Sequence, residues 1–268
     1  KGKGWEAGLM TTYFRYADKR LASSSATSTA NFTTAMVLDP YFKAKLGPVD
    51  LEGEAYYMSG KVNYDDARSY GNAAISDQAI KAKGLYLSGR YNMGPAYAGA
   101  SFVYTSGKDP SANTTNGQDI TGGMLASFGY TSDLGSDIWS DYLPNILLGA
   151  DGDPIHMYIP IKGKAVSLGQ SYDNLWLYNI FGGYAVTKKL SFNAKLSLAK
   201  LDKVYPAVSN SDALGTELDL RGEYKIYDSL SYNVGVAYLW TGDYYKGTQT
   251  VENVSNPYYL MHWLILKF

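Results

Sequence analysis

Apolar and polar residues alternate with a period of two along most of the chain, in runs of about 12 to 15 residues. Such alternation predicts β-strands with one apolar and one polar face. Ten strands are predicted in this way, over residues 4–17, 33–46, 49–62, 80–92, 95–107, 172–186, 190–202, 214–227, 230–243 and 257–268. Each is longer than the roughly 9–11 residues with which a tilted strand crosses a bilayer. No apolar run reaches the roughly 18 residues that a membrane-spanning helix needs.

The links between the predicted strands are alternately short and long. The short links are Gly47-Pro48, Met93-Gly94, Thr187–Lys189 and Asp228-Ser229. Polar links at 22–32, 65–78, 205–213 and 245–256 lie between them. Transmembrane barrels of the bacterial outer membrane have short periplasmic turns and longer extracellular loops. We therefore expect an all-β, antiparallel up-and-down barrel of about ten strands, with both termini on the periplasmic side.

The strand predicted over 214–227 shows how the two faces differ. Leu218, Leu220 and Tyr224 share one face, and charged residues occupy the alternate positions. A Lys or Arg that faces lipid near the bilayer centre costs roughly 2–4 kcal/mol, so a charged face must contact water or other charges. The same reasoning, applied where the alternation is clear, predicts a polar inner wall formed by Asp39, Lys43, Lys45, Glu52, Glu54, Arg90, Lys195, Glu217, Asp219, Arg221, Glu223 and Lys225.

This predicted wall contains six basic and six acidic residues, so it predicts no ionic selectivity. We expect the charges to separate into facing basic and acidic stripes, partly paired between neighbouring strands. Two interpretations stay open. The charges either line a polar lumen that solutes cross, or they pair with one another and fill a narrow barrel.

The stretch 108–171 interrupts the alternation, and we interpret it as a long loop inserted in a single barrel domain covering 1–268. Its apolar patch, 138–148, includes Trp139 and Tyr142 and needs burial against the inner wall. Loops of this length are usually functional or disordered, and we expect this one to narrow the barrel mouth. An alternative of 12 strands uses residues 120–130 and 155–167 as further wall strands.

One cluster within this loop resembles a site. Asp151, Asp153 and His156 carry the groups that bind a divalent cation or serve the chemistry of outer-membrane proteases. The same residues also suit an Asp/Gly turn, which is the interpretation we favour. His262 lies on the apolar face of the last predicted strand and not beside this cluster. We therefore expect no catalytic residue, metal or cofactor.

Composition narrows the classes of function. The 24 basic and 25 acidic residues form no basic cluster, which argues against nucleic-acid binding. Cysteine is absent, so disulfides, thiolate metal sites and haem attachment are excluded. The 26 tyrosines suit the aromatic girdles of a membrane barrel, although a secreted β-sandwich is also rich in Tyr and Gly. Sandwich strands are commonly about 5–6 residues long, and those predicted here run to about twice that length.

The last strand ends in Phe268, and it resembles the closing strand of bacterial outer-membrane barrels, whose terminal aromatic is thought to be read by the barrel-insertion machinery. Three further segments, Asp39–Pro48, Trp139–Gly149 and Glu217–Tyr244, resemble the porins related to the alginate-export family. That family implies larger barrels of 16 to 18 strands. The chain begins at Lys1 without an initiator Met, so we expect it to be either processed or the carboxyl-terminal part of something longer. The resemblance implies a shortened member of that family or one that lacks its amino-terminal half.

The resulting hypothesis is a passive outer-membrane channel for small hydrophilic or anionic solutes, with saccharides among the candidates. Two alternatives are an outer-membrane hydrolase with a loop site and a scaffold barrel that does not conduct. As partners we expect outer-membrane lipid and lipopolysaccharide, the insertion machinery and a small solute. The sequence does not indicate an oligomeric state.

Overall fold

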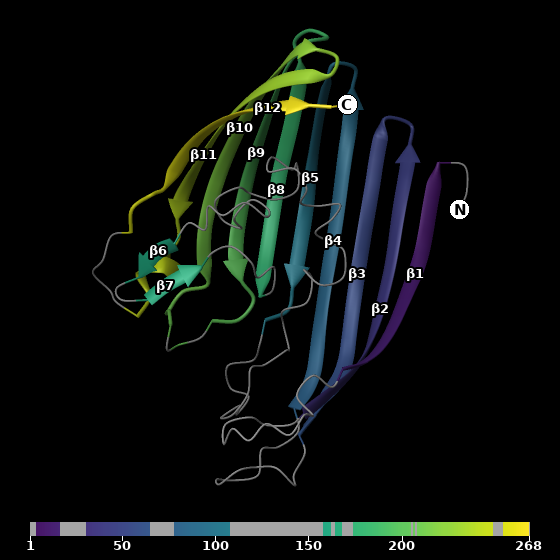
Figure 1. The fold of residues 1–268 in the computed structure, drawn as a ribbon, viewed down its shortest axis with the longest axis vertical. Coiled ribbons are helices and arrows are strands. Elements are labelled where there is room, and N and C mark those ends of the chain that lie inside the picture. The colour runs from purple at the N-terminus through teal and green to yellow at the C-terminus, as the bar shows by residue number, and fades with distance from the viewer. Residues whose placement is uncertain are drawn as a thin grey trace.

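The computed structural model describes residues 4–16, 31–64, 78–107, 158–161, 164–167, 174–204, 206, 208–248 and 254–267. Ten strands form one antiparallel sheet in which neighbours along the chain are neighbours in space (Figure 1). They are β1 (Trp5–Tyr16), β2 (Asn31–Leu46), β3 (Val49–Tyr64), β4 (Gln78–Met93), β5 (Ala96–Thr105), β8 (Leu175–Ala185), β9 (Leu190–Leu201), β10 (Ala213–Tyr227), β11 (Leu230–Thr241) and β12 (Tyr258–Leu266). The predicted fold class, an all-β up-and-down meander of ten strands, is confirmed.

The predicted strand boundaries agree closely with the observed ones. The largest difference lies at the start of β8, which was expected at residue 172 and begins at Leu175. Two of the short turns depend on glycine. Gly47 and Gly94 have φ angles of +62° and +63°, a region that only glycine enters without a steric cost and that two-residue hairpins require.

Two short strands lie outside this sheet. Strands β6 (Tyr158–Ile161) and β7 (Lys164–Ser167) pair with each other in a separate antiparallel hairpin. The 12-stranded alternative required residues 155–167 to form a single wall strand. This part of the alternative is wrong, because the segment contains two strands that pair only with each other. The other segment it required, 120–130, lies outside the described residues.

The sheet is strongly curved (Figure 1) but does not close on itself within the described residues. Strands β1 and β12 stand at opposite ends of the strand order, and each pairs with one neighbour only. A short 3₁₀-helix, η3 (Asp243–Lys246), follows β11. Among the described residues, no helix is long and apolar enough to span a membrane.

The two faces of the sheet differ in exposure as well as in chemistry. On one face, here called the outer face, large apolar side chains stand exposed; Leu9, Ile180 and Leu260 are 64%, 60% and 68% exposed. The opposite face, called the inner face, carries the buried residues. In β12 the outer positions Tyr258, Leu260, His262, Leu264 and Leu266 are all exposed and the inner positions between them are half-buried, as the alternation predicts.

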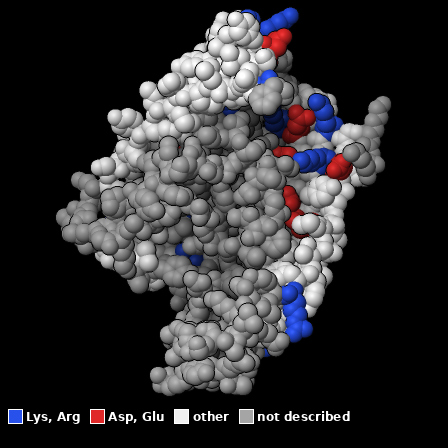
Figure 2. Space-filling model, viewed as in Figure 1, with Lys and Arg blue, Asp and Glu red and all other residues white. Residues whose placement is uncertain are grey.

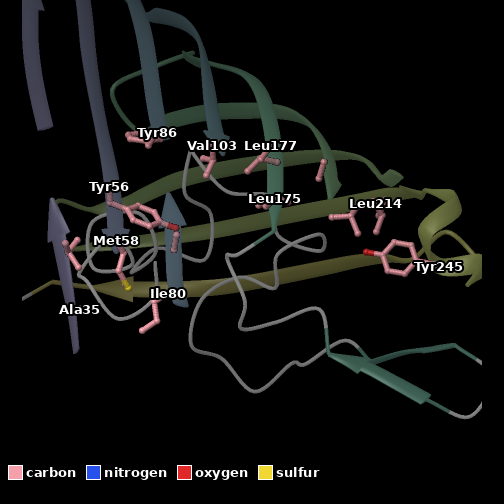
Figure 3. Packing of buried hydrophobic residues seen from close by; sticks show 14 of the residues in the cluster. Ala35, Tyr56, Met58, Ile80, Tyr86, Val103, Leu175, Leu177, Leu214 and Tyr245 are labelled. Carbon is pink, nitrogen blue, oxygen red and sulfur yellow. The ribbon is translucent and has the colours of Figure 1, made fainter. Parts of the chain in front are cut away.

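Towards the ends of the strands that lead to the long links, called the loop end, the inner face is apolar. The buried cluster there comprises Ala35, Val37, Tyr56, Met58, Ile80, Ala82, Tyr86, Val103, Leu175, Leu177, Ala199, Leu214, Ala237, Leu239 and Tyr245. Figure 3 shows most of these side chains, which come from several wall strands and, in the case of Tyr245, from the segment after β11. The sequence predicted a polar inner face throughout, and this apolar band departs from that expectation.

Candidate functional site

The inner face carries a continuous line of polar side chains that crosses eight strands in direct register. This first inner row consists of Glu6, Lys43, Glu52, Ser88, Ser101, Asn179, Ser197 and Glu217, each opposite the next on adjacent strands. Hydrogen bonds reinforce it. The Asn179 Nδ2 donates to Ser101 Oγ at 2.9 Å, and the Tyr86 hydroxyl donates to Glu52 Oε1 at 2.7 Å. Because eight successive strands of the sheet, β1 to β10, continue the row, the polar surface runs along most of the inner wall.

A second inner row lies two residues closer to the short turns and contains two ion pairs. It consists of Lys45, Asp50, Arg90, Gly99, Phe181, Lys195, Asp219, Ala237 and Tyr259. Lys45 Nζ lies 3.8 Å from Asp50 Oδ1, and both side chains are largely exposed. Lys195 Nζ lies 3.5 Å from Asp219 Oδ2, and both are buried. One row therefore holds an exposed and a buried pair of the same type.

Two arginines are held in place by an aromatic ring and an amide. The Arg90 guanidinium lies 3.6 Å from the centre of the Tyr97 ring, and its Nε donates to Asn92 Oδ1 at 3.0 Å. Tyr97 in turn donates its hydroxyl to Asn193 Oδ1 at 2.9 Å. A cation that stacks on an aromatic face loses orientational freedom. The wall therefore presents this positive charge in a fixed position.

Arg221 is held in the same manner on the inner face of β10, towards the other end of the strand order. Its NH2 group donates to Asn233 Oδ1 at 2.9 Å, and its guanidinium lies 5.5 Å from the centre of the Trp263 ring. The same NH2 group lies 3.7 Å from Glu223 Oε2. The contacts join β10, β11 and β12 through side chains in addition to their backbone hydrogen bonds.

A cavity of about 470 Å³ opens beside β1–β4 near the short turns. It is lined by Gly4, Trp5, Glu6, Lys43, Ala44, Lys45, Asp50, Leu51, Glu52, Ser88 and Arg90. Three of these residues are acidic and three are basic. Figure 2 shows basic and acidic side chains next to one another at upper right, where the short-turn ends of β1–β4 lie in Figure 1. The arrangement suits a polar solute or water and offers no excess of either charge.

All twelve charged residues predicted for the inner wall lie at inner positions of their strands. The expected pairing of opposite charges between neighbouring strands is observed, as in Lys43 opposite Glu52 and Lys195 opposite Asp219. Direct pairing lowers the electrostatic energy of each row, which explains why the signs alternate around the wall.

The residues predicted for the inner wall were charged ones only and did not include the uncharged members of the first inner row. They are Ser88, Ser101, Asn179 and Ser197, and all four are buried. In the row they connect the charged residues in one half of the sheet with those in the other half. Their signal was present, because each occupies an inner position by parity. The predicted loop residues Trp139, Tyr142, Asp151, Asp153 and His156 lie outside the described residues, as does Phe268. In the described part of the chain, no three potential metal ligands gather.

The apolar band of the inner face extends to η3. Tyr245 is buried there, and burial raises the pKa of its phenol above the ordinary value, so the group stays neutral at physiological pH. Met58, Leu177 and Leu239 in the same band have no exposed surface. The inner wall therefore changes along its length, from charged near the short turns to apolar and tightly packed near the loop end.

No protein-family model matches the sequence, and no curated protein matches it. Solved structures do resemble it. OmpT, an outer membrane protein of Vibrio cholerae, is 11% identical with a TM-score of 0.38, over 96% of this chain and 63% of that one. An outer membrane channel from Pseudomonas putida F1 is 16% identical with a TM-score of 0.35, over 90% of this chain and 74% of that one. The chain thus spans somewhat under two thirds of the length of OmpT.

Proposed function

We propose that the chain forms the wall of a passive channel in the bacterial outer membrane and carries no catalytic site. The observation that carries this proposal is the contrast between the two faces of one sheet. Its outer face exposes large apolar side chains, whereas the inner face carries two rows of polar and charged residues. Barrels in membranes alternate lipid-facing apolar and lumen-facing polar residues in this way. A protein in water would have to leave that apolar face uncovered.

Closure of the wall belongs to the proposal. Unpaired backbone groups at a sheet edge are too costly in hydrocarbon to persist. In the membrane, β1 and β12 must therefore be paired, either with each other or with further strands. We propose that both termini face the periplasm, and that the closing strand is recognised by the barrel-insertion machinery.

One buried hydroxyl group supports the presence of water inside the wall. The Ser197 hydroxyl is fully buried and has no hydrogen-bond partner among the residues that the structure describes. Buried polar groups are satisfied by protein or by ordered water in nearly all native proteins. The neighbouring positions in the first inner row, Asn179 and Glu217, are also polar. A water molecule or a solute hydroxyl at this point completes the row.

The solutes we propose are small and hydrophilic. Fixed cations such as Arg90 bind carboxylate or phosphate groups, and tyrosine rings stack on the apolar faces of sugars. The equal numbers of acidic and basic groups around the cavity favour neither anions nor cations. The apolar band at the loop end narrows the path, because a small barrel is nearly filled by its own side chains. Membership of the porins related to alginate export is part of this proposal, supported only by the three segments that resemble them.

Conductance across a planar bilayer tests the channel directly. The purified full-length protein, added at nanomolar concentration, is expected to give discrete current steps of small amplitude, with weak preference for either ion of potassium chloride. A matched sample that was heated and unfolded serves as the control. Insertion into the bilayer without any current steps would favour the scaffold barrel and contradict the channel.

A further inference from the structure

The outer face of the ten-stranded sheet carries five charged side chains, and all of them are basic. They are Arg15, Lys61, Lys81, Lys83 and Lys200, here called the basic belt. Each shares its parity along the strand with exposed apolar residues such as Tyr13, Tyr57, Leu87 and Leu198. No Asp or Glu occupies an outer position on these strands. The inner face of the same strands, by contrast, carries charged residues of both signs. The restriction to basic residues is therefore a property of the outer face.

The basic belt is confined to the loop end of the sheet. Arg15 is opposite Thr34, which is opposite Lys61 on the next strand. Lys81 and Lys83 follow on β4, opposite Ser59 and Tyr57. Lys200 stands at the corresponding end of β9, next to Leu201, where the strand stops. The belt therefore follows one rim of the wall from β1 to β9.

Aromatic residues lie directly beside the basic belt. Lys83 Nζ is 5.9 Å from the centre of the Tyr104 ring, and Lys200 Nζ is 5.9 Å from the Trp176 ring. The two rings themselves are in contact, with centroids 4.3 Å apart. Aromatic residues of membrane proteins concentrate at the boundary between hydrocarbon and headgroups. The contacts place the lysines at that boundary.

The outer face below the belt is uncharged. One row further from the loop end runs through Leu87, Phe102, Tyr178 and Leu198, and all later rows on this face lack charges as well. A Lys or Arg within the hydrocarbon is unfavourable. The change from an uncharged wall to a purely basic rim therefore marks the level of the lipid headgroups.

We propose that the basic belt binds the phosphate groups of lipopolysaccharide in the outer leaflet. This inference rests on the proposed function, because it requires the wall to stand in the outer membrane. Lys and Arg are the side chains that recognise phosphate, and every charged residue at an outer position of the described strands is one of these two types. Asp202 directly follows the end of β9, and its carboxylate contacts the aromatic residues beside the belt. It accepts hydrogen bonds from Trp176 Nε1 and the Gly107 N–H, both at 3.0 Å, so its charge is engaged locally.

Binding of lipopolysaccharide by charge-neutralised variants tests the proposal. The full chain is purified in mixed micelles, and its affinity for lipopolysaccharide is compared with that for chemically dephosphorylated lipopolysaccharide. The triple variant Lys61→Gln/Lys81→Gln/Lys83→Gln removes three of the five cations. Since one Lys near an anionic surface contributes about a fivefold gain in affinity, the expected loss is on the order of 100-fold at low salt. The single variant Lys83→Gln is expected to lose about fivefold.

The matched control is Lys188→Gln/Lys189→Gln/Lys267→Gln, which removes the same charge at the opposite end of the sheet, where these residues are exposed. It is expected to bind like the original chain. Equal binding by the belt variants, an equal loss in the control, or equal affinity for dephosphorylated lipopolysaccharide overturns the proposal. Conductance in neutral lipid is measured in parallel. Channel activity without phosphate-dependent binding rejects the belt and leaves the channel, whereas absence of both rejects the belt together with the proposed channel.

Discussion

Lys195 Nζ lies 3.5 Å from Asp219 Oδ2 across the pairing of β9 with β10, and both side chains are at most 6% exposed. Removal of one partner from a buried ion pair leaves an uncompensated charge and costs about 3–5 kcal/mol. We expect Asp219→Asn to lower the stability of the folded wall by an amount of this order. Guanidinium unfolding in lipid vesicles, followed by tryptophan fluorescence, measures the change.

The exposed pair Lys45 and Asp50, in the same row, provides the control. Exposed pairs contribute only about 0–1 kcal/mol, so Lys45→Gln is expected to leave the unfolding midpoint nearly unchanged. A double variant, Lys195→Met/Asp219→Leu, is expected to recover part of the lost stability because no lone charge remains. Equal effects of Asp219→Asn and Lys45→Gln are incompatible with burial of the first pair.

Charge on the outer wall is expected to be costly in the middle and tolerated at the rim. Ile180 lies near the centre of β8 and is 60% exposed. Ile180→Arg is expected to destabilise the folded protein by about 2–4 kcal/mol if this surface touches hydrocarbon. Lys200→Arg, at the rim of the same face, keeps its charge and is the matched control. The shift in unfolding midpoint in vesicles distinguishes the two, and a harmless Ile180→Arg speaks against lipid contact.

Opposite charges in the cavity are expected to act oppositely on ion selectivity. Glu52 and Lys43 face each other and both line the cavity. Glu52→Gln is expected to shift the reversal potential in a salt gradient toward anion preference, and Lys43→Gln toward cation preference. Lys188→Gln, at an exposed turn, is expected to leave the reversal potential unchanged. Reversal potentials that do not move in either cavity variant indicate that ions take another path.

The two edge strands are expected to be protected in the native membrane. If β1 and β12 pair with each other or with further strands, their amide hydrogens exchange as slowly as those of central strands such as β9. Hydrogen exchange of the protein in native membranes, read by mass spectrometry, measures this. Fast exchange confined to β1 and β12 indicates an open sheet, and a wall in hydrocarbon is then excluded.

The sequence predicted the strands and their faces because the period of a β-strand is fixed by geometry. Charged residues such as Glu217 and Asp219 identify the inner side wherever they alternate with apolar ones. Where both faces are apolar, as around Val103 and Leu177, alternation carries little information about the face, and the apolar inner band was missed. The pairing of Lys43 with Glu52 depends on strand register, which the hairpin turns determine and periodicity alone does not.

Single-cysteine labelling along β9 tests most directly whether the outer face contacts lipid and the inner face does not. The chain contains no cysteine, so each variant carries one label site. Labels at Leu196 and Leu198, on the outer face, are expected to be quenched by brominated lipid, whereas labels at Ser191 and Ser197, on the inner face, are expected to be protected from it. Quenching that alternates with a period of two along the strand is the predicted result. Quenching that is uniform or absent at all four positions contradicts a membrane wall.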